Sequence, residues 1–121
     1  MKITIEGELP DLNTIIAESK KGRKGYQPYA IMKREYTDLV TWKAKRIKKK
    51  YKKIDLKINW ICKNKRKDKD NIMAGTKFIL DGLVNAGIIN NDGWKEIGDI
   101  THTFDVDKEN PRVEVKIKEV I

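Results

Sequence analysis

Two aspartates, Asp68 and Asp70, stand two residues apart just after a run of cationic side chains. Carboxylate oxygens suit hard divalent cations, and magnesium commonly takes one or two of them together with water and phosphate oxygens. A protein that only binds nucleic acid gains nothing from carboxylates at the contact surface, because they repel phosphates. An enzyme that cuts phosphodiesters uses both charges, since cations hold the backbone and carboxylates hold the metal. The pair therefore indicates metal-dependent phosphodiester chemistry.

Further residues along the chain fit the same chemistry. In an extended segment Asp68 and Asp70 project from the same side of the backbone, so they can share one cation. Asp92 is the candidate third ligand, provided that the turn after the intervening helix folds back beside Asp68. Lys77 precedes Asp81 by four residues, which places both on one helix face and makes Lys77 a candidate for stabilising phosphate charge.

Each of these signals also has a plainer interpretation. The Asp70-Asn71 step can cap the following helix, and Asp92-Gly93 is a common turn pair. Lys77 and Asp81 can form an ordinary surface ion pair. A calcium-binding loop is excluded, because the segment after Asp68 lacks the glycine and the final glutamate of such a loop.

The charge balance narrows the class of partner. The chain has 27 Lys and Arg against 18 Asp and Glu, a formal net charge of +9. A basic excess attracts polyanions, either nucleic acid or an anionic membrane. The one strongly basic helix has only a modest apolar face, which a protein core would use, so nucleic acid ranks ahead of a membrane. The cations expected to guide a DNA backbone are Lys63, Lys65, Arg66 and Lys67. A lone cysteine, Cys62, excludes an internal disulfide and favours a reducing, cytoplasmic setting.

Periodicity predicts the elements that must position these residues. Residues 2–8, 54–62, 97–106 and 112–120 alternate apolar and polar side chains, as strands do. Apolar spacings of three and four predict a short helix ending near residue 18 and longer helices over 28–51 and about 71–85, with Gly87 as a stop. The core face of the 28–51 helix would carry Tyr36, Leu39, Val40, Ala44, Ile47 and Tyr51, with Trp42 packed at its flank.

The order of these elements predicts the architecture. A strand, two helices, a strand, a helix and two strands in 121 residues favour one domain over residues 1–121, in the α+β class, with a single mixed sheet and helices on one side. His102 falls within a strand and has no second histidine beside it, so a structural role is expected for it.

Taken together, the motifs resemble those of the RusA family of Holliday junction resolvases, including prophage-borne versions. The residues that carry the resemblance are Asp68-Lys-Asp70-Asn71, Lys77-Phe-Ile-Leu-Asp81-Gly82-Leu83, Ala86-Gly87 and Asn91-Asp92. The similarity also covers the first strand with its Leu9-Pro10-Asp11-Leu12-Asn13 exit and the closing strands. Two features depart from the family pattern: Lys77 lies about three residues later than usual, and Asn91 replaces the first member of an aspartate pair.

The resemblance implies a homodimeric endonuclease that binds four-way DNA junctions and makes paired symmetric nicks in recombination and repair. Its cofactor would be Mg²⁺, with Mn²⁺ as a substitute. Asp68, Asp70 and Asp92 would hold the metal, and Lys77 would stabilise the transition state. Two rival hypotheses remain open: a nuclease specific for other branched DNA or RNA, and a non-catalytic basic DNA-binding protein in which the aspartates are dispensable.

Overall fold

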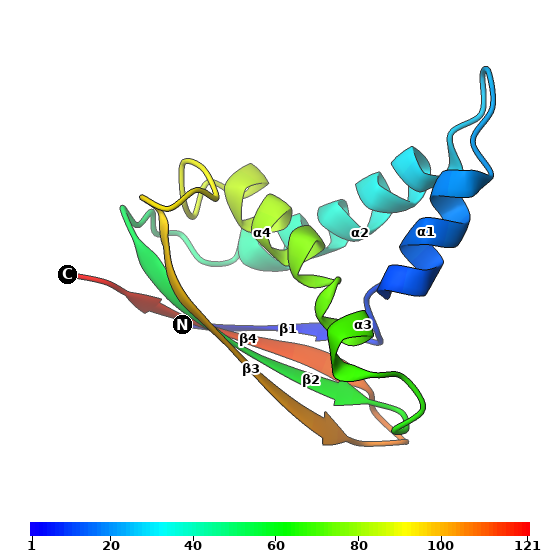
Figure 1. The fold of residues 1–121 in the computed structure, drawn as a ribbon. Helices are drawn as coiled ribbons and strands as arrows, with labels where there is room; N and C mark the ends of the chain where they lie inside the picture. The colour runs from blue at the N-terminus through cyan, green and yellow to red at the C-terminus, as the bar shows by residue number, and fades with distance from the viewer.

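Four strands form one mixed sheet, and the helices cover one of its faces (Figure 1). The computed structural model describes residues 1–121. Along the chain its elements are β1 (Lys2–Glu6), α1 (Leu12–Lys20), α2 (Pro28–Ala44), β2 (Ile54–Cys62), α3 (Lys69–Met73), α4 (Thr76–Asn85), β3 (Ile97–Val106) and β4 (Arg112–Glu119). The predicted α+β architecture with a single mixed sheet is confirmed. None of the helices combines the length and apolar character needed to cross a membrane.

The strand order of the sheet is β1-β4-β2-β3. Strand β4 runs antiparallel to both β1 and β2, whereas β2 and β3 are parallel and are joined by the α3–α4 crossover. Parallel neighbours end at the same edge of a sheet, so the chain leaving β2 emerges beside the end of β3. Strand β3 has only β2 as a neighbour, which leaves its outer edge unpaired.

The alternation predicted for the strands separates a buried face from an open one. Every second residue of β2 and β4 is buried against the helices, as Ile54, Leu56, Ile58, Val113 and Val115 illustrate. These side chains belong to one cluster of 18 buried residues between the sheet and helices α2 and α4. The alternate side chains point away from the helices, so the other face of the sheet is polar.

Helices α2 and α4 approach each other closely at Gly82. A Cβ atom added to Gly82 would lie 2.6 Å from the Cβ of Val40, so only glycine permits this crossing. Helix α4 then ends as predicted. Gly87 has φ +79°, and the backbone N–H of Ile88 donates to the Leu83 carbonyl, which satisfies a carbonyl of the last turn.

Helix α2 is shorter than the sequence predicts. It ends at Ala44 instead of near residue 51, and Ile47 and Tyr51 reach the core from irregular backbone. Cationic side chains follow one another through residues 45–50, and like charges at helical spacing oppose continuation of a helix. The predicted flank packing of Trp42 is wrong, since its side chain is 69% exposed, and Leu39 is exposed as well.

The helix predicted over about 71–85 is two helices. Helix α3 covers Lys69–Met73, and α4 begins at Thr76 after a break at Gly75. A Cβ on Gly75 would lie 3.0–3.1 Å from side-chain atoms of Leu9 and Trp60, so the chain is pressed against the sheet at this point. The break sets the direction of α3 independently of α4, and α3 carries Asp70.

Candidate active site

A cavity of about 840 Å³ opens at the carboxyl ends of β2 and β3, and it contains both members of the aspartate pair. The loop after β2 contributes Lys65 and Asp68, helix α3 contributes Lys69 and Asp70, and the end of β3 contributes Asp105. In Figure 1 this region is the green loop that passes beyond the arrowheads of β2 and β3, together with the short helix α3 above that end of the sheet. The cavity therefore combines three carboxylates with cations. Of these residues, Asp68, Asp70 and Lys65 were predicted from the sequence.

Asp68 and Asp70 are placed differently from the extended pair that was predicted. Asp68 is the residue preceding α3, with φ −70° and ψ 152°, and Asp70 lies in the first helical turn. Asp68 makes no capping hydrogen bond, and Asp70 accepts only the neighbouring backbone N–H of Asn71, at 2.9 Å. Both residues are exposed, and neither carboxylate lies within 4.0 Å of a cationic side chain. They are free to take a cation from solution.

Lys67 fastens the loop that carries these aspartates. Its ammonium lies 2.8 Å from Asp11 and 3.8 Å from Glu8, both at the exit of β1. The hydrogen bond to Asp11 raises the pKa of Lys67. Burial opposes ionisation of Asp11, but hydrogen bonds from Lys67 and from the backbone of Thr14 hold its pKa below the ordinary value. Lys67, predicted as a DNA contact, thus has an internal ion-pair partner.

A second contact ties α3 to the N-terminal segment. The side-chain oxygen of Asn71 accepts the backbone N–H of Asn13 at 3.0 Å. Asn71 therefore positions α3 against the start of α1 and does not cap its own helix. The other predicted backbone cations, Lys63, Lys65 and Arg66, are exposed and form no ion pair, although only Lys65 lines the cavity.

Sequence reasoning missed two charged residues of the cavity, Lys69 and Asp105. Asp105 occupies the penultimate position of β3, directly beside Ile61 of β2. The ammonium of Lys69 lies 5.3 Å from the ring centroid of Phe104, a cation–π contact that holds it at the cavity wall. Asp105 follows from the sequence only once β3 is known to pair in parallel with β2.

Lys77 is not among the residues that line the cavity. Its ammonium lies 3.7 Å from Asp81 on the same face of α4, which confirms the predicted shared face. Asp81 also lies 3.9 Å from Lys33 of α2, so this carboxylate joins the two helices. In this structure Lys77 and Asp81 form a surface ion pair, which is the plainer of the two interpretations.

Asp92 lies at the opposite end of the sheet. It borders a separate hollow with Gly93 and Trp94, in the turn that precedes β3. The expectation that this turn folds back beside Asp68 is wrong for a single chain. No three His, Cys, Asp or Glu side chains of one chain, the carboxylates of the cavity included, are grouped closely enough to hold a metal ion. Strand β3 has ten residues and separates Asp92 from the cavity by about 30 Å. Figure 1 shows the turn in yellow, at the tails of the strands whose arrowheads reach α3.

Structural roles are indicated for three residues at or near the cavity: Trp60, His102 and Cys62. Trp60 donates its indole N–H to Nδ1 of His102 at 2.9 Å, and the two rings are stacked. Burial lowers the pKa of His102, which keeps it neutral and able to accept this bond. The structural role predicted for His102 fits this contact. Burial raises the pKa of the Cys62 thiol, which disfavours the thiolate that binds metals.

Carboxylates free of cationic partners, set among lysines on a small basic α+β protein, are features of an enzyme that processes nucleic acid. Comparison with protein families identifies which one. The model of the family described as endodeoxyribonuclease RusA matches residues 13–118 of the 121. The chain belongs to the RusA endodeoxyribonuclease family, which confirms the resemblance seen in the sequence, and it is a nuclease of the Holliday junction resolvase type. No curated protein sequence matches the chain.

Proposed function

We propose that this protein is a magnesium-dependent endonuclease that resolves four-way DNA junctions by paired symmetric nicks, in cytoplasmic DNA recombination and repair. The observation that carries the proposal is the cavity at the ends of β2 and β3, where Asp68 and Asp70 are exposed and unpaired among cations. Two carboxylates with water and a phosphate oxygen satisfy the coordination that magnesium prefers, and manganese accepts similar ligands. When bound, the metal would polarise the phosphate and lower the pKa of a water nucleophile.

The protein side chains supply position and charge. Asp68 and Asp70 hold the cation, and the ion pairs of Lys67 keep their loop against β1. Lys65 and Lys69 already border the cavity, so they are placed to attract the scissile phosphate. Lys63 and Arg66 extend the same positive surface toward the flanking backbone. Lys77 would contribute only after leaving Asp81, since their ion pair holds it on the face of α4.

The third ligand, Asp92, reaches such a site only from a second copy of the chain. In a twofold dimer arranged along the free edge of β3, the start of one β3 lies beside the end of the other. The partner's Asp92 would then approach the cavity that holds Asp68 and Asp70. This arrangement makes the homodimer a requirement of the active site and gives each dimer two sites, one for each nick.

Exposed apolar side chains at both ends of β3 support this arrangement. Trp94, two residues after Asp92, is 96% exposed, and Val106 at the cavity end is 46% exposed. If the two β3 strands run antiparallel across the dimer interface, the indole of Trp94 in one chain would lie against Val106 and Phe104 of the other. Burial of a tryptophan at such a contact stabilises association, and aromatic anchors of this kind dominate many interfaces.

The test is cleavage of a labelled synthetic four-way junction with magnesium, beside a linear duplex of the same sequence, by the wild-type protein and by Asp70→Asn. We expect symmetric nicks in the junction that require the metal and vanish in the variant, which should still bind the junction. Binding by both proteins without cutting would leave a non-catalytic DNA-binding protein. Equal cutting of the linear duplex would retain the nuclease and remove the junction specificity.

A further inference from the structure

Three lysines occupy one row across the open face of the sheet. Lys116 of β4 is the direct register partner of Lys2 in β1 on one side and of Lys57 in β2 on the other. Directly opposed residues on one face have Cβ atoms about 5 Å apart, and like charges in such positions destabilise a sheet. The three side chains are exposed. A row of this kind weakens the fold unless an anion lies over it.

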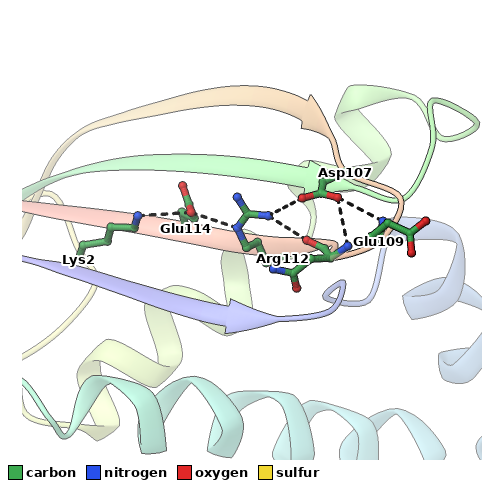
Figure 2. A network of polar contacts seen from close by, with 6 residues as sticks. Lys2, Asp107, Glu109, Arg112 and Glu114 are labelled. Atoms are coloured by element: carbon green, nitrogen blue, oxygen red, sulfur yellow. Dashed lines mark hydrogen bonds and ion pairs between the residues drawn. The ribbon is translucent and has the colours of Figure 1, made fainter.

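The neighbouring carboxylates neutralise only one end of the row. Lys2 lies 3.3 Å from Glu114, which also accepts a hydrogen bond from Arg112 at 3.1 Å. Figure 2 shows this network continuing from Arg112 to Asp107 in the β3–β4 loop. Lys57 and Lys116 have no carboxylate within 4.0 Å. Their charge is therefore available to an external anion.

The hollows of the open face lead from the lysine row to the candidate active site. Lys57 and Lys116 line two adjacent hollows, of about 600 and 280 Å³. The smaller hollow also contains Asp105, which borders the active-site cavity as well. Asn59 and Thr103, joined by a 3.0 Å hydrogen bond, lie between the row and Asp105 and offer polar groups along the way.

We propose that this lysine row, Lys2, Lys57 and Lys116, binds the phosphate backbone of the DNA arm that enters the active site across the open face of the sheet. Cys62 at the cavity lies five residue positions after Lys57 along β2, a span of about 17 Å. That span corresponds to about five base-pair steps of duplex DNA. The row thus contacts the arm about five base-pair steps from the scissile phosphate, and it fixes the line along which the arm crosses the protein.

A duplex arm suits this surface better than a protein partner does. The smaller hollow beside the row has no apolar lining, and the only exposed apolar side chain that lines the larger hollow is Met1, so the row lacks the apolar centre of a protein interface. Its like charges also oppose face-to-face association with a second copy. Asp55 and Asp99 border the larger hollow at its far end, where Asp55 accepts the backbone N–H of Asp99 and stands in register with Lys118. These carboxylates limit the anion site to the lysine row itself.

The inference deepens the proposed nuclease function, so its test is chosen to be independent of cleavage. Binding of the full-length protein to a labelled four-way junction is measured in EDTA over a range of salt concentrations. The variant is Lys57→Gln with Lys116→Gln, and the matched control is Lys48→Gln with Lys50→Gln. The control removes the same charge from exposed lysines between α2 and β2. Thermal unfolding is followed for all three proteins at low salt.

We expect the slope of log affinity against log salt to become shallower by about 1 to 2 in the row variant, and by clearly less in the control. We expect the row variant to melt at or above the wild-type temperature, because the repulsion between the lysines is removed. Equal slopes for variant and control, or a lower melting temperature for the row variant, would overturn the inference. A protein that binds in this way but never cuts would overturn only the nuclease proposal.

Discussion

The two ends of strand β3 differ in what surrounds their aspartates. At the carboxyl end, Asp105 shares a cavity with Asp68 and Asp70, and lysines border the same space. At the amino end, Asp92 stands in an exposed turn beside Trp94, with no other carboxylate lining its hollow. In the proposed function, the first end supplies most of a phosphodiester-cleaving site, and the second supplies one further metal ligand, Asp92, beside the exposed Trp94. If the proposed dimer forms, each chain contributes one half to each of two active sites.

The largest expected effect is a loss of cleavage when an aspartate at either end of β3 is replaced. Asp70→Asn and Asp92→Asn should each reduce junction cleavage by about a thousandfold or more, because each removes a ligand of the proposed metal-binding site. Both variants should bind the junction in EDTA as tightly as the wild type, or more tightly, since a negative charge has been removed from the DNA surface. Initial cleavage rates and binding isotherms measure the two quantities. Full activity in Asp92→Asn would show that the amino end of β3 has no part in the chemistry.

An intermediate effect is expected for the apolar contact. Trp94→Ser should weaken dimerisation by about tenfold to a hundredfold, because a large aromatic anchor is lost. The control is Trp42→Ser on α2, which removes the same side chain from another exposed position. Sedimentation velocity over a concentration series gives both dissociation constants. If the two variants dissociate equally, the turn that carries Asp92 is not part of the interface.

The sequence predicts the strands better than it predicts the site. The alternation in residues 54–62 and 112–120 depends on local burial, and these strands form within about one residue of their predicted bounds. The place of Asp92 depends on whether β2 and β3 pair in parallel, which is a long-range property. The break at Gly75 was missed for a similar reason, since it comes from contact with Trp60 and Leu9. The sequence could indicate Asp68 and Asp70 as a candidate pair because their residue type and their spacing can be read from one short segment.

The smallest expected effect is a pH dependence of stability that arises from His102, in the middle of β3. Burial holds the pKa of His102 below its usual value of 6.5, so the unfolded chain binds this proton more readily than the folded chain. The free energy of unfolding should therefore fall as the pH drops below about 6.5 and protonation opposes the bond from Trp60. His102→Gln should remove this part of the pH dependence. Urea unfolding at pH 7.5 and pH 5.5 measures it, and identical losses in both proteins would assign the change to other groups.

The most direct test of the split site is complementation between two inactive proteins. Asp70→Asn and Asp92→Asn chains are purified separately, then mixed and allowed to exchange subunits, and the mixture is assayed for nicking of a four-way junction with magnesium. A mixed dimer would have one site with Asp68 and Asp70 from one chain and the wild-type Asp92 from its partner. We predict that single nicks return in the mixture, while each variant alone stays inactive. A mixture that exchanges subunits and remains inactive would contradict an active site shared between two chains.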